Sequence, residues 1–131
     1  MSRYLVDSTG YAAFKRGHDG VKNSLQVASE ILISPIVLGE IHHAICNSPD
    51  VPRQLRELNQ FLDATRVALL PINEDTAERY GSIALALRQM GTPVPNHNIW
   101  VAASAMQYGA KVLTTDRHFL QIAQIRVDFH E

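Results

Sequence analysis

The feature of this chain that most restricts its fold is the alternation of short apolar runs with segments of helical spacing. Apolar runs at residues 3–6, 31–33, 67–72 and 111–114 predict four buried strands, and residues 125–127 suggest a fifth. Helices are expected between them, from about residue 9, from 21 to about 30, from 35 to about 47, after Asp50, after Asn73, and from 96 to 108. No hairpin turn signal joins two runs. The pattern is typical of an α/β fold whose mostly parallel sheet is covered on both faces.

Residues 95–106 predict a helix that is apolar on almost every side, which places it inside the domain. Its polar start, residues 96–98, is expected to cap the helix at the floor of a pocket. Asp7 directly follows the first predicted strand, and Asp116 lies just beyond the fourth. Ligand sites in such sheets lie beyond the carboxyl ends of the strands, so both aspartates should approach this pocket. Each can instead be an ordinary helix cap, because aspartate is favoured there.

Glu40 lies within the apolar arc of its predicted helix, between Ile36 and Ala44. A carboxylate on a core-facing stripe is costly unless it is paired or binds a metal. One interpretation is a buried salt bridge to Arg53 or Arg117. The other is that Glu40 joins the two aspartates around a divalent cation. Hard oxygen ligands favour Mg²⁺ or Mn²⁺, and such ions hydrolyse phosphodiesters.

Composition limits the remaining possibilities. The 131 residues, 46% of them hydrophobic, suit one globular domain spanning 1–131. A net charge of −1 weakens nucleic-acid binding without excluding it, because a local basic rim would be enough. A single cysteine, Cys46, favours a reducing cytoplasm, and no apolar run approaches a membrane span. Nucleophile-elbow and phosphate-loop motifs are absent, and the Glu-x-x-His unit of di-iron bundles occurs once instead of twice.

Several motifs together resemble the PIN-domain ribonucleases, specifically the VapC toxins of bacterial VapBC toxin–antitoxin pairs. The resemblance covers essentially the whole chain, in order, and its pieces are Tyr4-Leu5-Val6-Asp7-Ser8-Thr9, Ser34-Pro35-Ile36-Val37-Leu38-Gly39-Glu40, Leu70-Pro71-Ile72, Ala77-Glu78-Arg79-Tyr80, Gly91-Thr92-Pro93-Val94-Pro95, Trp100-Val101-Ala102-Ala103 and Thr114-Thr115-Asp116-Arg117-His118-Phe119.

The resemblance implies a three-layer α/β/α sandwich, Mg²⁺- or Mn²⁺-dependent cleavage of RNA (often tRNA), a homodimer, and a VapB antitoxin that covers the acidic groove. Carried over to this chain, the metal ligands are Asp7, Glu40 and Asp116. Ser8 and Thr114 are then supporting hydroxyls near the metal. A rim of Lys15, Arg16, Arg53, Arg56 and Arg117 is a candidate for holding the RNA backbone, although each alone is more readily explained as an ordinary solvated charge.

One departure falls at the start of the apolar helix. VapC toxins usually read Asn-Asp-x-Trp-Ile-Ala-Ala, whereas this chain has His97-Asn98 before Ile99 and Trp100. The fourth acidic position is therefore an amide, which can coordinate a metal or orient water without a full charge. We expect weaker metal binding and a single ion. The alternative is a catalytically silent PIN module that only binds a partner, through drift or through a substitution introduced to silence a toxin.

Overall fold

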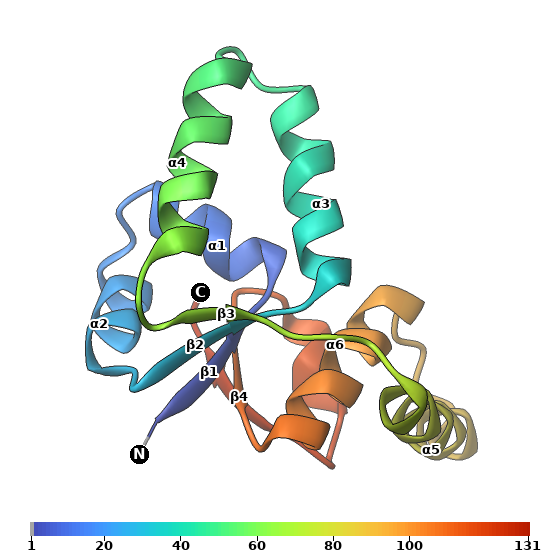
Figure 1. Cartoon of the computed structure of the whole chain (residues 1–131). Coiled ribbons are helices and arrows are strands. Elements are labelled where there is room, and N and C mark those ends of the chain that lie inside the picture. The colour runs from blue at the N-terminus through green and yellow to red at the C-terminus, as the bar shows by residue number, and fades with distance from the viewer. Residues whose placement is uncertain (1) are drawn as a thin grey trace.

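The computed structural model describes residues 2–131 (Figure 1). Within these residues five strands form one sheet in the order β3-β2-β1-β4-β5, and every neighbouring pair is parallel. This confirms the predicted α/β fold and the fifth strand. The strands are β1 (Arg3–Val6), β2 (Glu30–Ile33), β3 (Val67–Leu69), β4 (Lys111–Thr114) and β5 (Arg126–Phe129).

Helices cover both faces of this sheet, which gives the expected three-layer α/β/α arrangement. The α3–α4 pair forms a hairpin that projects from one face above α1, whereas α5 and α6 pack together on the opposite side (Figure 1). The elements are α1 (Ser8–Lys15), α2 (Asp19–Val27), α3 (Pro35–Cys46), α4 (Val51–Asp63), α5 (Glu74–Met90), α6 (Asn96–Tyr108) and the short 3₁₀ helix η1 (Arg117–Gln121).

Local sequence signals set most helix ends. The side chains of Ser34 and Asp50 accept hydrogen bonds from backbone N–H groups at the starts of α3 and α4. Asn73 and Thr76 form a reciprocal capping box at the start of α5. Gly91 ends α5 with a φ of 67°, a left-handed conformation that favours glycine. The predicted caps at these three helix starts are therefore confirmed.

Two predicted boundaries are wrong. The third strand ends at Leu69 instead of residue 72, because the ladder closes with the N–H of Leu70 on the carbonyl of Ile33 and Pro71 has no N–H to continue it. The second helix ends at Val27 instead of about residue 30. Ala28 is already extended there (ψ of 133°), and the chain enters β2 two residues later.

The chain order creates a switch point beside the central strand. From β1 the chain proceeds to β2 and β3 on one side, and it then crosses to β4 and β5 on the other. The carboxyl ends of β1 and β4 therefore flank a crevice, the usual ligand position in open α/β sheets. Leu5, Val6, Val112 and Leu113 are fully buried beneath it. Among the helices of residues 2–131, none has both the length and the apolar character needed to cross a lipid bilayer.

Candidate active site

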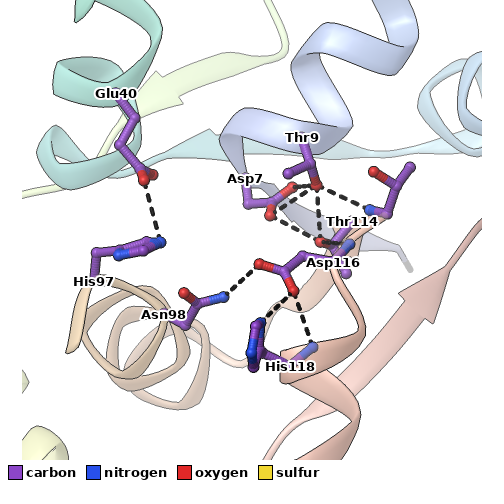
Figure 2. Close-up of polar contacts among 9 residues, drawn as sticks. Asp7, Thr9, Glu40, His97, Asn98, Thr114, Asp116 and His118 are labelled. Atoms are coloured by element: carbon purple, nitrogen blue, oxygen red, sulfur yellow. Dashed lines mark hydrogen bonds and ion pairs between the residues drawn. The ribbon is translucent and has the colours of Figure 1, made fainter. Parts of the chain in front are cut away.

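Asp7 leaves the end of β1 and is held by three neighbours. It is the N-cap of α1, where its Oδ1 accepts the backbone N–H of Gly10 at 2.7 Å. The hydroxyl of Thr114, at the end of β4, donates to Oδ2 at 2.8 Å. Thr9 Oγ1 lies 2.9 Å from Oδ1 and 3.0 Å from Oδ2. The residue is only 4% exposed. Asp7 is thus a helix cap, as one interpretation held, but its carboxylate also belongs to a buried polar network (Figure 2).

Burial raises the pKa of Asp7 from its ordinary 3.8 to about 6. The hydrogen bonds from Gly10, Thr114 and Thr9 favour the charged form and oppose this shift. The negative charge of Asp116 adds to it, which shows that the two carboxylates share one electrostatic environment. A cation placed near both would relieve the cost of burying this charge.

Asp116 lies beyond β4 and caps η1. Its Oδ1 accepts the backbone N–H of His118 at 3.0 Å and lies 2.8 Å from Nδ1 of the same residue. Its Oδ2 accepts the amide N–H of Asn98 at 3.0 Å. Partial burial favours a higher pKa for Asp116, but the hydrogen bonds from His118 and Asn98 outweigh it and lower the pKa below the ordinary value. Near pH 6, Asp116 is therefore ionised while Asp7 is partly protonated.

Asn98 reaches this network from the first turn of α6. It is 1% exposed, and its Nδ2 donates to Asp116 while its buried Oδ1 has no hydrogen-bond partner within residues 2–131. The prediction that polar side chains at residues 96–98 cap this helix is wrong. Pro95 occupies the N-cap position, and no side chain caps the helix. The polar residue at position 98 crosses to a neighbouring strand end instead of bonding to its own backbone.

Glu40 contacts a residue that the sequence did not single out. Its Oε2 lies 3.3 Å from Nε2 of His97, at the start of α6, and its side chain is 32% exposed. The alternative prediction of a salt bridge from Glu40 to Arg53 or Arg117 is wrong, because these arginines pair with Asp50 and Glu131. Figure 2 shows the Glu40 carboxylate directed at His97, apart from the hydrogen-bonded group around Asp7 and Asp116.

Sequence reasoning also missed Thr9. Its hydroxyl contacts Asp7, lies 3.1 Å from Oγ1 of Thr114, and accepts the backbone N–H of Thr115 at 3.0 Å. Ser8 instead lines a groove of about 250 Å³ between α1 and α3. The signal for Thr9 was available, since a hydroxyl two residues after an aspartate readily bonds back to it.

The predicted basic rim is only partly available. Lys15 pairs with Glu57 at 2.5 Å, and Arg53 and Arg117 have the acidic partners named above. Arg16 and Arg56 are exposed and form no ion pair with residues 2–131. Lys15 and Arg16 line the same groove as Ser8 and Glu40.

At the switch point of the parallel sheet, the Thr114 hydroxyl joins the Asp7 carboxylate to the backbone N–H of Asp116. The sequence profile of the PIN domain matches residues 4–125. The chain belongs to the PIN domain family.

Known PIN proteins resemble the chain along most of its length. It is 26% identical over 95 residues to ribonuclease VapC4 from Mycobacterium tuberculosis, covering 72% of this chain and 73% of that protein. Its fold is similar to that in the structure of VapBC2 from Rickettsia felis bound to a promoter DNA fragment, with a TM-score of 0.86, 22% identity, and 98% and 99% of the chains covered. DNA-bound VapBC from Salmonella typhimurium gives a TM-score of 0.84 at 24% identity, with 98% of both chains covered.

The donor atoms of this PIN domain suit a hard divalent cation. Asp7 and Asp116 supply carboxylate oxygens, and the unpartnered Oδ1 of Asn98 supplies a neutral one. Among residues 2–131, however, no three His, Cys, Asp or Glu side chains form a ready-made metal group. Glu40, the third predicted acidic ligand, contacts His97 instead of joining such a group.

Proposed function

We propose that this PIN domain is a VapC-like toxin, an endoribonuclease that uses Mg²⁺ or Mn²⁺ to cleave RNA, with tRNA a candidate substrate. The observation that carries the proposal is the meeting of Asp7 and Asp116 across the β1–β4 switch point, bridged by Thr114. Ribonuclease VapC4 from Mycobacterium tuberculosis is 26% identical over 95 residues, which is 72% of this chain. That likeness supports the reaction class.

Each site residue has a role that its contacts suggest. Asp7, Asp116 and Glu40 are the proposed metal ligands, and Asn98 contributes its free amide oxygen. Thr9 and Thr114 fix the orientation of the Asp7 carboxylate. A bound divalent ion supplies an activated water and neutralises charge on the phosphate under attack. Asp7 is buried, and the electrostatic interactions of its carboxylate are stronger there than they would be in water.

We assign the RNA backbone to the groove between α1 and α3. Ser8, the neighbour of Asp7 in the chain, lines this groove together with Glu40, Lys15 and Arg16. Exposed cations along such a path hold phosphates without reading sequence. Arg56 is a further candidate, and Lys15, Arg53 and Arg117 can contribute only by leaving their acidic partners. An RNA substrate would be met in the cytoplasm, and we propose that the toxin acts there.

We propose a VapB-type antitoxin as the partner, and a homodimer as the working form of the toxin. Two solved structures that resemble this chain are described as DNA-bound VapBC2 and VapBC, which supports the antitoxin partner. The homodimer is proposed from the resemblance to VapC toxins alone. We also take the whole chain as one PIN domain, because a single sheet includes all strands from β1 to β5 and one core cluster runs from Tyr4 to Ile122.

The decisive assay is cleavage of total tRNA by the purified protein with Mg²⁺, with EDTA, and with the Asp7→Ala variant. Cleavage should need the ion and should be lost in the variant. Activity that survives either treatment would remove the metal mechanism. Arg88→Ala, a change of an exposed cation on α5, is the matched control and should leave cleavage intact.

A silent PIN module is the second candidate, and Asn98 is the observation that favours it. The amide carries no negative charge where VapC toxins usually have an aspartate. It also donates a hydrogen bond to Oδ2 of Asp116. Asn98→Asp separates the two proposals. If the restored acid produces cleavage and toxicity where the native chain shows neither, the native chain is a binding module.

A further inference from the structure

The first turn of α6 places two neighbouring side chains on the acidic site. Asn98 bonds to Asp116, and His97 contacts Glu40. Consecutive residues at a helix start point about 100° apart, so one turn can reach two separate carboxylates. The start of α6 therefore acts on two acidic residues of the site, not on one.

The contact between His97 and Glu40 joins α6 to α3. Nε2 of His97 lies 3.3 Å from Oε2 of Glu40, with side-chain exposures of 49% and 32%. A hydrogen on Nε2, as in one neutral tautomer, is enough for a hydrogen bond. In Figure 2 the Glu40 carboxylate turns to the imidazole, and no contact links it to Asp7 or Asp116. Glu40 is thus held at the edge of the site.

A vacant acceptor lies on the same side of the site. Oδ1 of Asn98 is buried and has no partner within residues 2–131, although unsatisfied buried oxygens are uncommon. In Figure 2 this oxygen is on the side of the amide that faces His97 and Glu40, whereas the nitrogen faces Asp116. A cation accepted by this oxygen would draw Glu40 toward it. Oε2 of Glu40 cannot bind the cation while it bonds to Nε2 of His97.

We propose that His97 is an internal competitor for Glu40, and that a divalent cation must displace this histidine to complete its ligand set. The inference rests on the proposed metal-dependent function. In this proposal His97 is a positioning residue that weakens metal binding. It therefore lowers the fraction of the toxin that holds a metal ion when the cation concentration is low.

The test is the affinity of the full chain for Mn²⁺, measured by isothermal titration calorimetry and by the loss of the free Mn²⁺ signal in electron paramagnetic resonance. His97→Ala should lower the Kd roughly two- to fivefold, the effect expected of losing a half-exposed polar contact. His43→Ala removes an exposed imidazole from α3 and should leave the Kd unchanged. Melting curves in EDTA verify that each variant is folded.

A double-variant cycle separates release of Glu40 from a general change in charge. In the Glu40→Gln background, His97→Ala should no longer tighten Mn²⁺ binding, because no carboxylate remains to be released. Equal Kd values for the native chain and His97→Ala would overturn the inference and leave the metal mechanism intact. Weaker binding by His97→Ala would make the imidazole a ligand and also overturn it. Absence of Mn²⁺ binding in every variant would overturn both this inference and the proposed function.

Discussion

The side-chain nitrogen of Asn98 donates a hydrogen bond to Oδ2 of Asp116 at 3.0 Å, which joins the start of α6 to the end of β4. A carboxylate in place of the amide would set two negative charges against each other at this point. The amide instead satisfies Asp116 without any cation and helps to lower its pKa. Asn98 therefore stabilises the metal-free form of the site.

Asn98→Asp should destabilise the metal-free protein and make its stability depend on Mn²⁺. Losing the hydrogen bond and adding a like charge should cost about 1–3 kcal/mol in EDTA. Saturating Mn²⁺ should recover part of this loss. The measurement is urea denaturation with and without the ion. Asn96→Asp, at the exposed first position of α6, is the control and should be neutral or slightly stabilising. Equal losses in the two variants would contradict the assigned role of Asn98.

The raised pKa of Asp7 predicts that acid stabilises the metal-free site. Burial raises the pKa to about 6 in the folded protein, above the ordinary 3.8. The contribution of Asp7 to the free energy of unfolding is therefore greatest below pH 3.8 and is lost as the pH rises through about 6. A shift of this size corresponds to at most about 3 kcal/mol.

Asp7→Asn removes this titration and tests the prediction. Unfolding free energies in EDTA should show the variant gaining on the native chain as the pH rises from about 4 to about 7. A difference that stays constant across this range would show that Asp7 has an ordinary pKa. Mn²⁺ binding should weaken in the native chain below about pH 6 for the same reason, because the carboxyl must lose its proton to bind a cation.

Two buried hydroxyls should respond oppositely to removal. Thr114 Oγ1 donates to Asp7 and accepts the backbone N–H of Asp116 at 2.9 Å, so Thr114→Val should cost about 1–3 kcal/mol. Ser104 Oγ is buried in α6 without a partner in the described part of the chain, so Ser104→Ala should be neutral or mildly stabilising. Thermal denaturation in EDTA measures both. A Thr114→Val protein as stable as the native chain would mean that its hydroxyl does not organise the site.

Gly10 permits the close approach of α1 to β4, and Gly10→Ala should damage the site. An added Cβ would lie 2.5 Å from the carbonyl oxygen of Leu113 and 3.2 Å from Oδ1 of Asp7. The backbone oxygen cannot rotate away, so we expect a loss of about 1–3 kcal/mol together with weaker Mn²⁺ binding. Gly81→Ala, in an open position of α5, should instead stabilise by up to about 1 kcal/mol. A harmless Gly10→Ala would refute the tight packing.

The fold was predictable because its signals are local. Alternating apolar runs located the strands, and Ser34, Asp50 and Asn73 marked helix starts by bonding to their own backbone. The approach of Asp7 to Asp116 also followed, since both stand after parallel strands at one edge. The structure places both beside Thr114, whose hydroxyl bonds to the Asp7 carboxylate and to the backbone N–H of Asp116.

The side-chain pairings of α6 were not predictable. A polar residue in the first turn of a helix can cap that helix or cross to another element, and the sequence pattern is the same for both. Whether Glu40 meets an arginine, a metal or His97 depends on how α3 and α6 pack, which the chain order leaves open. The roles of the site residues as metal ligands stay predictions.

Diffraction from crystals soaked in Mn²⁺ tests the central claim most directly, because anomalous scattering locates the ion without any assay of activity. The account predicts one anomalous peak within coordination distance of Asp7, Asp116 and Oδ1 of Asn98, with Glu40 turned away from His97. The same crystals soaked in EDTA should lose the peak and restore the His97–Glu40 contact. A crystal in millimolar Mn²⁺ with no peak among these side chains would contradict the proposal that this site is a metal-dependent nuclease centre.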